Sequence, residues 1–213
     1  MSTATNKYPF FDLSEIVPDP DFVYQPYQPL KPVKAGNNIP DFALKTEYAL
    51  WQRFYNGSET HGPIVLRQLI NKPLVISFYS KHWLDLGIEQ LKHLNAIQHE
   101  IRANGGDLLV ITAENDESLV NTAWKHSLSL NFYHDKDNEL AEKFRVFSET
   151  DPAWNRFSGI DTNVPLPATF VISPNRQVVF ANADMDFPGS FSTNEVISAI
   201  NGAALVNDNK KSA

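Results

Sequence analysis

The chain contains no cysteine among its 213 residues. It can therefore form no disulfide, and it offers neither a thiolate nucleophile nor a second thiol to resolve an oxidised one. The absence of cysteine neither supports nor excludes a reducing compartment. Any chemistry that the chain performs must rely on other side chains.

Several other features are missing. The net charge of −7 and a pI near 5.3 provide no basic face, which argues against nucleic acid and against anionic membrane surfaces as partners. No apolar run approaches membrane-spanning length, and residues 1–11 lack the pattern of a signal peptide, so a cytoplasmic location is the default expectation. The sequence also lacks a glycine-rich phosphate loop and a Gly-x-Ser-x-Gly nucleophile motif.

What is present alternates between predicted strands and predicted helices. The strands are 74–79, 107–113 and a short extended 131–134; the helices are 84–103, 117–127 and 138–147. The sequence of residues 148–164 predicts a long irregular loop, here called the excursion. A hairpin of 168–173 and 177–181 follows, turning at Pro174-Asn175-Arg176, and a closing helix spans 193–201. This order predicts a thioredoxin-like α/β fold, a three-layer α/β/α sandwich around a mixed sheet.

The first 37 residues differ in composition, because prolines alternate with aromatic residues there. Proline fixes φ and removes a backbone donor, so this arm is expected to be extended. A disordered tail would contain fewer aromatic residues. We favour an arm that packs on its own domain, and an arm that reaches a second subunit remains the alternative.

The turn after strand 74–79 is the position of greatest chemical interest. Trp83 lies at the junction with the following helix, where the helix dipole would lower the pKa of a nucleophilic cysteine. The next residues are Leu84, Asp85, Leu86 and Gly87 instead. The expected nucleophile is absent.

Four segments resemble the peroxiredoxin-like AhpC/TSA family. Phe78, Tyr79 and Trp83 are similar to the Phe-Tyr-x-x-x-Trp-Cys-x-x-Cys branch, with Leu84 and Gly87 at the two cysteine positions. The other three are the opening 38–44, the segment 166–172 around Pro167, and 184–187, which is similar to an Asp-x-Asp-Tyr segment. The resemblance covers about residues 36–201 and implies a thioredoxin-like domain with a cis proline at Pro167.

The resemblance also implies a catalytic arginine three residues after the Asp-x-Asp-Tyr segment, and here that position is Ser190. Two losses at one site argue against a relocated thiol. An engineered removal would usually leave serine or alanine, so we interpret Leu84 and Gly87 as natural. Met1 and Met185 cannot replace the thiol catalytically without a dedicated reductase.

The residues left around the former cysteine pocket are the binding candidates: Lys81, His82, Trp83, Asp85, Trp154, Pro167 and Thr169. Lys81 and His82 beside a helix N-terminus could bind an anion. A solvated turn with Asp85 facing the helix dipole is the favoured interpretation. Asp85, Glu89 and His93 share one helix face, but we interpret them as solvent-facing and predict no metal and no cofactor.

We divide the chain into an arm (1–37), a thioredoxin-like domain (38–203) and a polar tail (204–213). The favoured function is that of a redox-inactive pseudo-enzyme with a binding or scaffolding role. The alternative is an enzyme that reuses the pocket for non-thiol chemistry on a small ligand, with His82 or Lys81 as base or anion holder. An antioxidant peroxidase assignment from homology would overstate the chemistry. The resemblance makes a homodimer plausible, and a protein partner is a further possibility.

Overall fold

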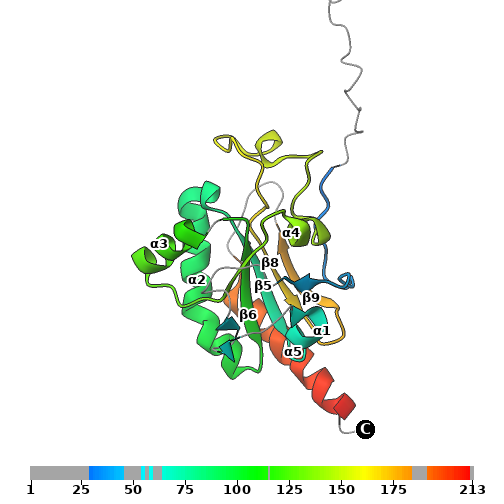
Figure 1. Cartoon of the computed structure of the whole chain (residues 1–213). Coiled ribbons are helices and arrows are strands. Elements are labelled where there is room, and N and C mark those ends of the chain that lie inside the picture. The colour runs from blue at the N-terminus through cyan, green and yellow to red at the C-terminus, as the bar shows by residue number, and fades with distance from the viewer. Residues whose placement is uncertain are drawn as a thin grey trace, which may run out of the picture.

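The computed structural model describes residues 29–45, 54–55, 58–59, 64–114, 116–183 and 191–211 (Figure 1). Its strands are β1 (Ala43–Leu44), β2 (Phe54–Tyr55), β3 (Ser58–Glu59), β4 (Ile64–Val65), β5 (Leu74–Tyr79), β6 (Asp107–Thr112), β7 (Phe132–His134), β8 (Ala168–Ile172) and β9 (Val178–Ala183). Its α-helices are α1 (Leu66–Leu69), α2 (Leu84–Ala103), α3 (Asp116–His126), α4 (Glu139–Lys143) and α5 (Thr193–Lys211). Two 3₁₀ helices, η3 (Lys81–Trp83) and η4 (Ala153–Asn155), complete the fold.

A five-stranded sheet in the order β7-β6-β5-β8-β9 forms the centre of the molecule. β5, β6 and β7 are parallel, whereas β8 runs antiparallel to both β5 and β9. The carboxyl ends of the three parallel strands therefore meet at one edge, where ligands bind in open α/β sheets. This mixed sheet confirms the predicted thioredoxin-like α/β class.

Alternation along β5 separates two core layers. Leu74, Ile76 and Phe78 point to one face, which is covered by α1, α4 and residues 30–44. Val75 and Tyr79 point to the other face, which is covered by α2, α3 and α5. Both faces of the sheet are thus buried, as the three-layer prediction requires.

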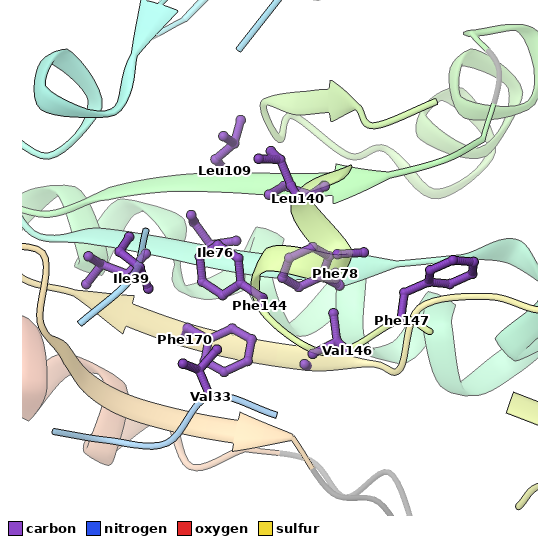
Figure 2. Close-up of a cluster of buried hydrophobic side chains, with 14 of the residues drawn as sticks. Val33, Ile39, Ile76, Phe78, Leu109, Leu140, Phe144, Val146, Phe147 and Phe170 are labelled. Atoms are coloured by element: carbon purple, nitrogen blue, oxygen red, sulfur yellow. The ribbon is translucent and has the colours of Figure 1, made fainter. Parts of the chain in front are cut away.

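Aromatic rings pack against one another at the centre of the first layer, among aliphatic side chains (Figure 2). The ring of Phe144 lies 5.3 Å from that of Phe78 and 5.1 Å from that of Phe170, measured between centroids. All three side chains are fully buried. Phe147 lies at the margin of the cluster.

Several element predictions need correction. The helix predicted over 138–147 is only α4, because Arg145 adopts a left-handed φ of +56° and ends it. The closing helix continues to Lys211, well past residue 201. The apolar spacing of Leu84, Ile88 and Leu91 also predicts that Leu84 lies on the buried stripe of α2, but 70% of Leu84 is exposed. The described residues contain no cis peptide bond, so the expectation of a cis proline at Pro167 is wrong.

Residues 29–37 of the predicted arm pack against the domain. The N–H of Gly36 donates to the carbonyl of Val178, and Leu30 and Val33 belong to the first core layer. The rest of the arm, residues 184–187 and Ser190 lie outside the described residues, so the predictions made for them remain predictions. No helix in the described ranges is long and apolar enough to cross a membrane.

Candidate functional site

The candidate site is the turn that joins β5 to α2 at the carboxyl edge of the sheet. Ser80 caps η3, its Oγ accepting a hydrogen bond from the N–H of His82 at 3.2 Å. Leu84 then begins α2 with a φ of +50°, a conformation that is uncommon for a bulky residue. The side chain at the first cysteine position is therefore an exposed leucine on a strained backbone.

Glu114, which follows the end of β6, fastens this turn from the neighbouring strand. Its Oε1 accepts hydrogen bonds from Ser80 Oγ at 3.0 Å and from the N–H of Lys81 at 3.1 Å. Its Oε2 lies 3.2 Å from Lys81 Nζ. Glu114 is itself buried, so these contacts lie in a poorly solvated environment where they are stronger than at the surface.

The Glu114 clip, meaning the contacts of Glu114 with Ser80 and Lys81, was not predicted from the sequence. The only local signal was an acidic residue directly after a buried strand, at the edge where the parallel strands end. The clip also argues against the hypothesis that Lys81 binds an external anion. A carboxylate of the chain already accepts hydrogen bonds from the donors that an external anion would need.

Trp83 anchors the turn to the opposite side of the site. Its Nε1 donates to the carbonyl of Pro165 at 2.8 Å, and its ring meets that of Phe157 edge to face at 5.0 Å. Trp83 is almost fully buried, so it serves as a core residue in this conformation. The excursion 148–164 therefore contacts the turn through Phe157, while 48% of Trp154 is exposed.

Gly87, at the second cysteine position, is held by close contacts. A Cβ at this position would lie 3.0 Å from the backbone oxygen of Ser80, 3.0 Å from Tyr79 Cε2 and 3.3 Å from Trp83 Cβ. These distances are shorter than ordinary van der Waals contacts, and one of the neighbours is backbone. A side chain here would require its neighbours to shift by a few tenths of an ångström.

Polar groups beneath the turn bond to one another. Ser77 Oγ lies 2.9 Å from Thr169 Oγ1, and Gln90 Nε2 donates to Ser77 Oγ at 2.8 Å. Thr169 is fully buried, and Pro167 is also buried. Gln90 Oε1 is buried without a hydrogen-bond partner. This network joins β5, β8 and α2 and is closed to solvent at the two hydroxyl groups.

The remaining candidates lie at the surface of the turn. Lys81 and Asp85 are exposed and His82 is partly exposed. Glu89 is exposed, whereas His93 stacks on Phe191 and its Nε2 lies 2.7 Å from Thr193 Oγ1. Within the described ranges, no group of three histidine, aspartate or glutamate side chains is placed to hold a metal.

The hydroxyl of Tyr79 lies beneath the turn in a buried position. Burial raises the pKa of this hydroxyl, a hydrogen bond with Thr122 opposes this, and the nearby charge of Glu114 adds to the rise. Tyr79 is therefore protonated at neutral pH and offers no base. Two cavities lined by described residues lie away from this turn, one beside Pro29–Lys31 and the other beside Lys45.

The sequence also matches a known protein family. The model of the AhpC/TSA family matches residues 35–181, more than half of the chain. The chain therefore belongs to the AhpC/TSA family. It is a member that lacks cysteine altogether. No curated protein matches the sequence.

Solved structures support the fold. The chain is similar to peroxidoxin BcpB from Mycobacterium tuberculosis, with 18% identity, a TM-score of 0.56, and coverage of 79% of this chain and 97% of that one. AhpC from the same organism gives 16% identity and a TM-score of 0.57 over 84% and 96% of the two chains. Peroxiredoxin Q from Xanthomonas campestris gives 23% identity and a TM-score of 0.53 over 67% and 86%. At these identities the likeness establishes the fold alone.

Proposed function

We propose that this protein is a redox-inactive member of its family that uses the β5–α2 turn as a binding or scaffolding surface. The proposal rests on one observation: Leu84 and Gly87 occupy the two cysteine positions of a turn that Glu114 and Trp83 hold in place. Leu84 cannot ionise, and a Cβ added at Gly87 would lie within 3.0 Å of the turn. A thiol peroxidase needs a thiolate at this helix N-terminus, and the chain has none to supply.

The exposed side chains of the turn favour binding. Leu84 is 70% exposed and Leu86 is 37% exposed on the first turn of α2. The Glu114 clip and the Trp83 anchor hold this turn in place, so little conformational freedom remains to be lost when a partner binds. Apolar side chains displayed on a rigid element suit a protein partner or a small apolar ligand.

The enzyme alternative has weaker support, because Lys81 Nζ, one of its two candidate groups, already lies 3.2 Å from Glu114 Oε2. It requires an accessible base or acid in an open pocket. Glu114 has hydrogen-bond partners on both carboxylate oxygens, and the Tyr79 hydroxyl is buried. We therefore rank reuse of the pocket for non-thiol chemistry second, and we regard an antioxidant peroxidase function as an overstatement of what this chain can do.

Peroxide consumption tests the proposal. Wild-type protein should show no NADPH-coupled turnover of hydrogen peroxide with thioredoxin or glutaredoxin reducing systems. A Leu84→Cys variant should form a sulfenic acid faster than a Leu205→Cys control, because only residue 84 lies at the N-terminus of a helix. Leu205 is a similarly exposed leucine far along α5.

Each outcome is informative. Turnover by the wild type would overturn the proposal and assign the chemistry to a group other than a thiol. An inert wild type with a reactive Leu84→Cys variant would support a preserved scaffold without its nucleophile. We also propose, from family membership, that the protein forms a homodimer, and we keep the cytoplasm as its expected location. Light scattering and cell fractionation would test these two points.

A further inference from the structure

A groove of about 800 Å³ lies beside the first described residues, remote from the β5–α2 turn. One wall consists of Pro29, Leu30 and Lys31. The facing wall comes from the end of α4 and the start of the excursion: Glu142, Arg145, Phe147, Ser148, Glu149 and Thr150. Two cationic and two anionic side chains line it, so their charges cancel. Phe147, at the margin of the aromatic core, supplies an apolar side chain.

The chain enters this groove in a fixed direction. The N–H of Leu30 donates to Asp151 Oδ2 at 2.7 Å, and that carboxylate is paired with Arg156. The N–H of Val33 donates to the carbonyl of Phe144 at 3.1 Å. Residues 1–28 must therefore leave the described structure at the groove.

Arg145 has an unusual backbone for its side chain. It follows the last turn of α4, where the N–H of Val146 donates to the carbonyl of Ala141, and its φ is +56°. Glycine is the residue best suited to this position. Arg176 has a similar φ of +69°, but its guanidinium is paired with Asp41 at 2.8 Å. Arg145 makes no ion pair among the described residues and lines the groove instead.

We propose that residues 20–28 of the same chain bind in this groove, with their aromatic rings against Phe147 and Arg145. This segment, Pro-Asp-Phe-Val-Tyr-Gln-Pro-Tyr-Gln, has three aromatic residues, two prolines and one charge. Such a segment matches a groove of balanced charge that contains the apolar side chains of Pro29, Leu30 and Phe147 and the guanidinium of Arg145, since arginine stacks favourably on aromatic rings. Prolines keep the segment extended and lower the entropy lost on binding.

The same chain is the favoured occupant because its first described residue already lines the groove. Residue 25 is four residues from Pro29, a span of at most about 14 Å. A segment tethered so closely has a local concentration in the millimolar range, which a second copy would not reach at ordinary protein concentrations. The proposal is independent of whether the β5–α2 turn binds a partner.

The absence of native cysteine permits a disulfide-trapping test in the full-length chain. Gln25→Cys is combined either with Glu142→Cys, which lines the groove, or with Lys143→Cys, its exposed neighbour on α4 outside the groove. We expect the Glu142 pair to form an intramolecular disulfide about tenfold faster than the Lys143 pair. Equal rates would overturn the proposal, since they are expected of an undocked tether. A disulfide-linked dimer that is selective for residue 142 would also overturn it, and would assign the groove to a second copy.

Arg145→Gly provides a second test, with a variant that is expected to fold normally. Glycine relieves the left-handed backbone, so this variant should be at least as stable as the wild type. In the Glu142 pair it should slow disulfide formation about threefold, because the contact between guanidinium and ring is lost. An unchanged rate would exclude Arg145 from the bound state.

Discussion

At the scale of single residues, Gly87 shows how a replaced position can become structurally required. Its Cα lies so close to the turn that an added Cβ would meet the backbone oxygen of Ser80 at 3.0 Å. The turn and α2 lie so close together that an added Cβ requires its neighbours to shift by a few tenths of an ångström. Restoring a cysteine at this position would therefore displace the turn slightly as well as add a thiol.

We predict that Gly87→Ala lowers the free energy of unfolding by about 1–3 kcal/mol, the usual cost of overpacking. The matched control is Gly202→Ala on α5, where nothing lies within 4 Å of the added Cβ. That substitution should raise the free energy of unfolding by about 0.5–1 kcal/mol, because alanine is the better helix former. Urea denaturation measures both. Equal effects of the two variants would mean that the close approach at Gly87 has no energetic weight.

At the scale of elements, the start of α2 depends on a carboxylate from another strand. The Glu114 clip links the end of β6 to η3, and Leu84 retains its left-handed φ next to it. A strained residue persists only when its surroundings hold it in place. The clip and the Trp83 anchor are the contacts that do so.

We predict that Glu114→Ala lowers the free energy of unfolding by about 1–3 kcal/mol, because it leaves Ser80 Oγ and the N–H of Lys81 without their acceptor. Hydrogen exchange should also accelerate at Lys81, whose N–H donates to Glu114, more than at amides in the middle of α2. Glu100→Ala, at an exposed position on α2, serves as the control and should change neither quantity. Unchanged exchange at Lys81 in the Glu114 variant would refute the clip.

The start of α4 also depends on a buried carboxylate. Asp135 Oδ2 accepts hydrogen bonds from the N–H groups of Leu140 and Ala141 at 2.9 and 3.0 Å. Burial raises the pKa of Asp135, and these backbone donors only partly oppose the rise. A carboxyl group whose pKa is higher in the folded state binds its proton more tightly there, so its contribution to stability grows as the pH falls toward that pKa.

We therefore predict that the free energy of unfolding of the wild type increases relative to that of Asp135→Asn as the pH falls from about 7 to about 4. Urea denaturation at a series of pH values would measure the difference in free energy of unfolding. Asp137→Asn, at an exposed position of the same loop, should show no comparable trend. A difference that shifts toward the Asp135 variant in acid would show that the hydrogen bonds outweigh burial.

At the scale of the whole molecule, the elements that could be predicted are those with local signals. β5 and β6 are apolar runs of strand length, and the β8–β9 hairpin is marked by Pro174 and Asn175. The Glu114 clip and the contacts of Gly87 join residues whose proximity exists only after folding, so no local pattern indicates them. The sequence predicts too long a helix at α4, because the left-handed position that ends it is occupied by Arg145 and not by glycine, the residue that usually marks such an end.

The two core layers share one sheet, and this predicts how the molecule unfolds. Phe144→Ala in the first layer should lower the free energy of unfolding by about 3–5 kcal/mol, and Leu94→Ala in the second by about 2–5 kcal/mol, since both side chains are fully buried. Of the chain's four tryptophans, three lie in the described residues, and Trp83 is the buried one among these; it belongs to the first layer only. Because β5 contributes to both layers, Leu94→Ala should still shift the tryptophan fluorescence transition and the far-ultraviolet circular dichroism transition to the same lower urea midpoint. Separate midpoints would show that the two faces of the sheet unfold independently.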